Sequence, residues 1–217
     1  YVLKLYPKVH VIVKDTSRYN FIDAFLKMLK DSGQIQSLTR THAKAVRCTG
    51  FAFVGMEENS GFVCRADVDV LRNTFLPLLD RTEGVRSRRI FISRKHASRR
   101  FDNQEEIENA VQAAGLQIVD LESMDISAQL LLFNQAELIV ANHGAGLANL
   151  VWGSSDARVV EMFSPRFLND CYFRLAKTMG MSYDYMIATG TGTWGKIAVD
   201  DLMRKIEGGV SVKENMV

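Results

Sequence analysis

The sequence predicts an α/β protein with a doubly wound parallel sheet, in which helices cover both faces. In its second half, short apolar runs alternate with segments of helical periodicity, the pattern of repeated strand–helix units. The apolar runs are nearly continuous rather than alternating, as expected for strands buried on both faces. One of them, at 138–141, leads through a turn with two glycines directly into a helix.

Each element of this half follows from its apolar spacing and from the glycines that end it. Strands are expected at 89–93, 116–121, 138–141, 158–163 and 183–187, and helices at 103–114, from 127 onward, and at 146–152, 169–179 and 199–206.

The first half of the sequence shows fewer patterns that predict strands or helices. A strand at 9–13, a helix with apolar positions between 21 and 29, strands at 35–38 and 45–54 and a helix at 67–79 are expected. The polar stretch 82–87 lacks apolar periodicity and is the best linker candidate. It divides the chain into segments 1–86, 87–190 and 191–217, of which the last is a loop and a helix.

Composition narrows the class of protein. The 217 residues are 47% hydrophobic and 24% charged, as in a globular protein, and a net charge of +2 does not indicate nucleic-acid binding. Seven Arg or Lys residues and no acidic residue lie between 86 and 100, which suits an anionic ligand or a solvated basic loop. Three cysteines form no metal-binding or disulfide pattern, and no apolar run is long enough to span a membrane.

The turn at Gly144 and Gly146 is the strongest functional signal. A helix that starts there leaves its first backbone N–H groups without partners and directs the positive end of its dipole at a ligand. A diphosphate is the natural occupant. The alternative is that the glycines only allow close packing of strand and helix.

Three groups of polar residues follow neighbouring strands and should meet at one edge of the sheet. Ser93 and Arg94 follow one strand, Asn142 and His143 another, and Glu161 lies at the end of a third. Arg94 can clamp phosphate oxygens, and His143 can hydrogen-bond a phosphate or donate a proton. Arg99 is a weaker candidate.

Glu161 lies 15 residues beyond Gly146, near the position of the ribose-binding acid of dinucleotide-binding folds, so an NAD-dependent oxidoreductase remains an alternative. Two strand–helix units precede this glycine turn, however, and a histidine stands directly before it. Asp67 and Asp69 imitate an Asp-x-Asp metal motif, but acidic residues at the start of a helix explain them more simply.

Several motifs in order resemble the family 61 glycosyltransferases over about residues 88 to 188. They are Ile92-Ser93-Arg94, Asn103 with Glu105 and Glu106, Leu121-Glu122, the segment 131–136, the segment 143–150 and Val159-Val160-Glu161. This family includes bacterial capsular-polysaccharide enzymes, plant xylosyl- and arabinosyltransferases, and animal O-linked N-acetylglucosaminyltransferases.

The resemblance implies two Rossmann-like lobes of the B-type glycosyltransferase architecture: an acceptor-side lobe at 1–86, which we expect to be incomplete, and a donor-binding lobe at 87–190. It implies an inverting, metal-independent transfer from a nucleotide sugar, UDP-linked in our reading, to a hydroxyl of a glycan or glycoprotein, without cofactor. Arg94 and His143 would be catalytic, with the base on the other lobe, and Glu161 would reach the nucleoside. The expected donor-binding residues are Ser93, Arg94, Arg99, Asn142, His143, Gly144, Ala145, Gly146, Leu147, Asn149 and Glu161.

Two further expectations stay open. The compartment is cytoplasmic if the protein is bacterial, and otherwise the lumen of the Golgi or the endoplasmic reticulum. A non-catalytic module that binds sugar nucleotides, or a truncated remnant of an enzyme, is the main functional alternative, and it would bind a donor without turning it over.

Overall fold

A computed structural model describes residues 9–14, 20–47, 50, 63–79, 89–94, 100–190, 192 and 194–208. By their contacts the residues fall into two compact units. The first unit comprises Tyr1–Ser60 and Asn73–Leu78, and the second comprises Gly61–Arg72 and Leu79–Val217.

The first unit contains a strand–helix–strand arrangement. Strands β1 (His10–Lys14) and β2 (Ser37–Thr41) pair in parallel, and α2 (Asn20–Asp31) connects them. The strand predicted at 35–38 is observed at 37–41, and the buried Ile35 lies in the bend before it. Of the strand predicted at 45–54, the described residues 45–47 and 50 form none, and the others lie outside the described residues.

The second unit holds a five-stranded parallel sheet, which confirms the predicted fold class. The spatial order is β4-β3-β5-β6-β7, so the chain adds β4 on one side of β3 and then crosses to build the other side. This is the order of the flavodoxin-like doubly wound folds. The strands are β3 (Arg89–Ile92), β4 (Gln117–Val119), β5 (Leu138–Asn142), β6 (Arg158–Phe163) and β7 (Ser182–Ile187).

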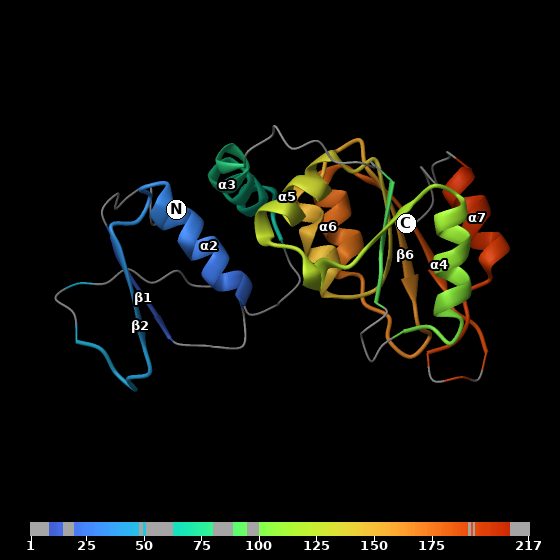
Figure 1. The fold of residues 1–217 in the computed structure, drawn as a ribbon, viewed down its shortest axis with the longest axis horizontal. Helices are drawn as coiled ribbons and strands as arrows, with labels where there is room; N and C mark the ends of the chain where they lie inside the picture. The colour runs from blue at the N-terminus through green and yellow to red at the C-terminus, as the bar shows by residue number, and fades with distance from the viewer. Residues whose placement is uncertain are drawn as a thin grey trace. The chain divides into compact units, whose positions relative to one another are not determined.

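Helices cover both faces of this sheet (Figure 1). One face carries α4 (Gln104–Ala113) and α7 (Val199–Glu207). The other carries α5 (Ile126–Gln135), the 3₁₀-helix η3 (Ala145–Trp152) and α6 (Cys171–Met179). Within the described part of the chain, no helix has the length and apolar character needed to cross a lipid bilayer.

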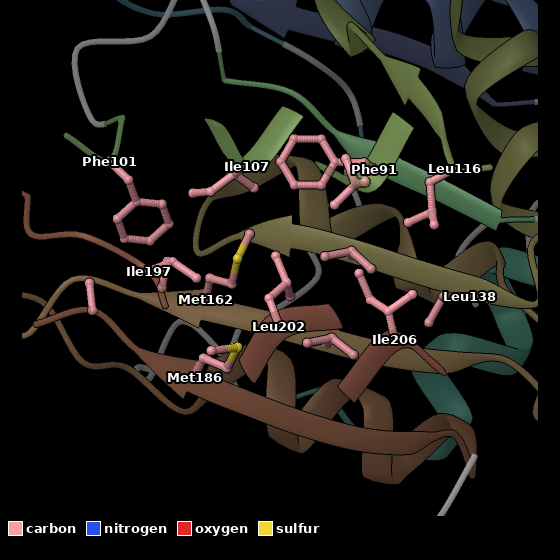
Figure 2. Packing of buried hydrophobic residues seen from close by; sticks show 14 residues of the cluster. Phe91, Phe101, Ile107, Leu116, Leu138, Met162, Met186, Ile197, Leu202 and Ile206 are labelled. Carbon is pink, nitrogen blue, oxygen red and sulfur yellow. The ribbon is translucent and has the colours of Figure 1, made fainter. Parts of the chain in front are cut away.

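The main core lies between the sheet and the helices α4 and α7 (Figure 2). Alternate residues of the strands, such as Val140 and Met162, contribute to it because successive side chains of a strand point to opposite faces. Leu202 and Ile206 of α7 belong to the same cluster. The expected terminal segment 191–217 therefore packs, through its helix, into the core of the second unit.

The boundary between the units falls within α3 (Arg65–Phe75), which continues into the 3₁₀-helix η1 (Leu76–Leu78). In the second unit, Arg72 donates from Nη1 to the carbonyl of Val151 at 2.9 Å and to that of Gly153 at 2.7 Å. These bonds explain why 61–72, expected in the amino-terminal lobe, groups with the second unit. The linker predicted at 82–87 lies outside the described residues.

Candidate functional site

The candidate site lies where the order of the strands reverses, between the carboxyl ends of β3 and β5. In open α/β sheets the crevice at this point is the usual place for a ligand. Arg94 stands two residues after the end of β3, and His143 and Gly144 follow β5 directly. The two segments that the sequence singled out therefore meet here.

The guanidinium of Arg94 lies against the glycine turn. Its Nη1 donates to the carbonyl oxygen of His143 at 2.6 Å. A Cβ atom on residue 144 would stand 2.4 Å from Nη1 and 2.6 Å from Cζ of Arg94. The backbone of Gly144 is extended, a conformation open to any residue, so glycine serves here to make room for the guanidinium.

Gly144 also caps the start of η3. The N–H of Leu147 donates to its carbonyl at 2.9 Å, which leaves the N–H groups of Ala145 and Gly146 ahead of the first bond of the helix. A Cβ on Gly146 would come within 2.9 Å of Leu121 Cδ1. Gly146 therefore allows Leu121 to pack closely, and Gly144 leaves room for the guanidinium of Arg94.

His143 is held by a buried carboxylate. Its Nδ1 lies 2.5 Å from Oε1 of Glu161, and the phenol of Tyr183 donates to Oε2 of the same carboxylate at 2.5 Å. The side chain of Glu161 has no exposed surface, and that of His143 is 10% exposed. Both oxygens of a buried carboxylate thus have partners, as a stable buried charge requires.

The protons of this triad can be assigned from its chemistry. Burial, with the charge of Glu161 added, raises the pKa of the Tyr183 phenol, so this group stays protonated and donates. An ionised Glu161 only accepts, so the Nδ1 of His143 carries a proton toward it. The remaining ring nitrogen, Nε2, is then the atom of His143 that can act on a ligand.

Aromatic side chains enclose the imidazole of His143. The ring of Phe163 stacks on it with centroids 5.0 Å apart and planes 24° apart. The rings of Phe167 and Tyr172 are tilted against it, each at 5.3 Å. Burial raises the pKa of Tyr172 to about 12, and the nearby charge of Arg94 opposes this shift.

A family model described as Glycosyltransferase 61 matches residues 7–160, more than half of the chain. The chain belongs to glycosyltransferase family 61. The matched range includes most of the first unit, where the resemblance seen in the sequence was loose, and it ends before β7. Curated proteins gave no match.

Membership of family 61 indicates glycosyltransferase activity, with a sugar donor and an acceptor as substrates. Of the residues predicted for this family 61 glycosyltransferase, the structure brings Arg94, His143 and the turn Gly144-Ala145-Gly146 together. The predicted convergence of Arg94 with the glycine turn is confirmed. The roles of these residues stay predictions.

The structure gives Glu161 a different position from the one expected. A carboxylate that reached the nucleoside, or the ribose of NAD, would need an oxygen turned to the ligand. Here the side chain is fully buried, and its oxygens contact His143 and Tyr183. We therefore replace the expected nucleoside contact by a role exerted through His143.

Other predicted donor-binding residues hold the scaffold. The hydroxyl of Ser93 donates to Glu108 of α4 at 2.7 Å, and the amide of Asn149 donates to Gln129 of α5 at 3.1 Å. Leu147 is 1% exposed and packs in the interior. Arg99 lies outside the described residues.

The carboxylates of the Asp-x-Asp motif lie at the start of α3. Asp67 accepts from the backbone N–H of Cys64 at 3.4 Å, and Asp69 pairs with Arg65 at 2.9 Å. Asp67 thus stands in the first turn of the helix, as the simpler reading of the motif expects, and Asp69 follows one turn on in an ion pair with Arg65. Within the described residues, no group of three His, Cys, Asp or Glu side chains gathers as a metal site would require.

Tyr183 and Tyr172 were missed from the sequence. Tyr183 lies on β7 opposite Val159 of β6, two residues from Glu161, and in a parallel pair such neighbours share a face. The parallel register of the last two strands, once assumed, could have placed this phenol beside Glu161. Nothing in the sequence pattern marks Tyr172, which comes from α6.

Proposed function

We propose that this family 61 glycosyltransferase binds a nucleoside diphosphate sugar, UDP-linked, with the diphosphate between the Arg94 guanidinium and the start of η3. The observation that carries the proposal is the guanidinium held at the glycine turn, 2.6 Å from the His143 carbonyl. An arginine fork and the N–H groups at a helix start both suit phosphate oxygens.

The transfer runs in line with inversion. A hydroxyl of a glycan or glycoprotein attacks the anomeric carbon, and the bond from that carbon to the diphosphate oxygen breaks, leaving its electron pair on the diphosphate. Arg94 and the N–H groups of Ala145 and Gly146 stabilise the charge that develops there, which needs no divalent ion. The proton of the attacking hydroxyl goes to a base on the acceptor side.

His143 supports departure of the diphosphate. When both ring nitrogens carry protons, Nδ1–H donates to Glu161 and Nε2–H donates to an oxygen of the leaving diphosphate. The buried carboxylate of Glu161, fixed by Tyr183, stabilises the positive imidazolium and sets the orientation of the ring. Glu161 and Tyr183 are thus positioning residues.

A turnover assay tests the proposal. UDP-glucose, UDP-galactose, UDP-N-acetylglucosamine and UDP-xylose are incubated with the protein, with and without EDTA, and release of UDP is followed. We expect release from at least one donor, unchanged by EDTA, and loss of about 2–4 kcal/mol of transition-state binding in Arg94→Ala. Arg204→Ala is the matched control, because this arginine is 76% exposed on α7.

Two results would contradict the proposal. Binding of UDP without turnover of any donor would instead support the non-catalytic module. Turnover that needs a divalent ion, or that persists in Arg94→Ala at the level of Arg204→Ala, would remove the role of the guanidinium.

A further inference from the structure

A hollow lies beside His143 at the carboxyl ends of β5 and β6. It is small as it stands, with a volume of about 20 Å³, room for about one water molecule. Three aromatic side chains and two polar ones join His143 in its wall: Phe101, Phe167, Trp194, Asn142 and Ser164.

Asn142 brings an unpaired hydrogen-bond acceptor to it. The residue is 5% exposed, and its Oδ1 is buried with no partner among the described residues. A buried carbonyl oxygen left without a donor costs free energy, so such atoms are uncommon in native proteins. A ligand that presents an O–H or N–H would satisfy it.

The orientation of this amide is fixed by a chain of hydrogen bonds from α4. Nδ2 of Asn142 donates to Oε1 of Gln104 at 3.0 Å, and Nε2 of Gln104 donates to Glu108 at 3.0 Å. A carboxylate can only accept, so Gln104 must present its oxygen to Asn142. Asn142 must then keep Oδ1 as its outer atom.

The aromatic wall is positioned by the loop before α7. Asn103 donates from Nδ2 to the carbonyl of Ile197 at 2.9 Å and accepts from the N–H of Ile197 at 3.1 Å. The N–H of Asp102 donates to the carbonyl of Gly195 at 2.9 Å. These bonds hold the loop that carries Trp194 against the segment that carries Phe101.

We propose that this hollow takes the sugar that is transferred, with one sugar hydroxyl donating to Asn142 Oδ1 and the ring packing on Trp194. This inference rests on the proposed function. Because His143 lines the hollow and is assigned to the leaving diphosphate, the group on the other side of the bond that breaks belongs here. That group is the sugar, whereas the nucleoside lies beyond both phosphates.

Occupancy requires the covering side chains to move apart, since Oδ1 is enclosed. Trp194 is partly exposed, and Phe167 is 44% exposed, so both side chains border solvent and can change rotamer. The sugar hydroxyl then takes the place of the apolar atoms beside Asn142 Oδ1. The indole of Trp194 packs on the C–H face of the sugar ring.

Calorimetric titration with matched ligands tests this assignment. Wild type, Asn142→Leu, Arg94→Ala and the control Asn109→Leu, which alters an exposed amide on α4, are titrated with UDP and with the four UDP-sugars used for turnover. We expect one UDP-sugar to bind wild type more tightly than UDP does. Asn142→Leu should lose about tenfold in affinity for that UDP-sugar, the value of one hydrogen bond, and keep its affinity for UDP. Asn109→Leu should bind both ligands as wild type does.

The results separate the inference from the proposed function. Equal affinity of UDP and every UDP-sugar, or an equal loss for both ligands in Asn142→Leu, would overturn the sugar site alone. Unchanged UDP binding in Arg94→Ala, or no binding of any of these ligands to wild type, would overturn the diphosphate site and with it this inference.

Tryptophan fluorescence of the unaltered protein gives a second readout, which does not depend on a variant folding. The chain has two tryptophans, and Trp152 is 3% exposed within the core. Saturating UDP-sugar should shift the emission of Trp194 beyond the change caused by UDP, and Trp194→Phe should abolish that difference. Identical spectra with UDP and with each UDP-sugar would count against the sugar site.

Discussion

The guanidinium of Arg94 occupies the space that a side chain on Gly144 would fill. The nearest guanidinium nitrogen would stand 2.4 Å from an added Cβ, closer than real Cβ contacts come. The two residues are 50 positions apart and meet because β3 and β5 are neighbours in the sheet. A glycine and an arginine that follow neighbouring strands together form the cationic edge of the site.

Replacing Gly144 by alanine should displace Arg94 without unfolding the protein. The obstacle is the far end of a flexible side chain, so the backbone can stay while the guanidinium moves. We expect UDP affinity to fall about tenfold or more, because a charge-assisted bond is lost. Calorimetry measures this, with Gly50→Ala as control, since an added Cβ there meets nothing within 4 Å. Equal UDP affinities of the two variants would contradict the account.

Glu161→Gln tests the positioning of His143. The new amide has one oxygen for the Tyr183 phenol, so its NH₂ group would face Nδ1 and disfavour a proton there. We expect kcat to fall about 10²–10⁴-fold with a much smaller change in the donor KM, because proton donation by His143 is impaired. Steady-state kinetics check this against Glu105→Gln, which alters an exposed carboxylate of α4. A rise in KM at unchanged kcat would instead indicate that Glu161 binds the donor.

The raised pKa of the Tyr172 phenol should make the free energy of unfolding depend on pH in alkaline solution. Burial raises its pKa to about 12, against about 10 for an unfolded chain. Between these values the unfolded state holds fewer protons, so the free energy of unfolding falls as pH rises. Tyr172→Phe should flatten this decline, which urea unfolding at several pH values from about 9 to 11 measures. Parallel pH slopes for wild type and variant would show that Tyr172 titrates as an exposed tyrosine.

Truncation in α7 tests whether the carboxyl-terminal helix belongs to the core of the second unit. Leu202 is fully buried between the sheet and α4. We expect Leu202→Ala to lower the free energy of unfolding by about 2–5 kcal/mol through lost burial and the cavity left behind. Leu168→Ala makes the same change at a 59% exposed site and should cost far less. Comparable losses in urea unfolding would contradict this packing.

Much of the fold of the second unit could be predicted from its sequence. Strands such as 138–142 are buried on both faces, so their apolar runs are unambiguous, and Gly115 and Gly180 end the helices α4 and α6 at positive φ. The packing of α7 on α4 could not be predicted, because it joins segments about 90 residues apart. In the first unit, only the start of β2 was predicted, because its residues after Leu38 are polar.

The candidate site could be predicted in part. The rule that ligands meet the carboxyl ends of parallel strands placed Arg94 beside the glycine turn. The rule does not say which way a side chain turns, and Glu161 is fully buried with its oxygens on His143 and Tyr183. The contact with Tyr183 depends on the register of β6 and β7, which apolar spacing alone does not fix.

A crystal structure of the protein with bound UDP tests the central claim most directly. The account predicts diphosphate oxygens about 3 Å from the Arg94 guanidinium and from the backbone nitrogens of Ala145 or Gly146. A diphosphate bound elsewhere, with Arg94 still on the His143 carbonyl and no ligand at the glycine turn, would contradict it.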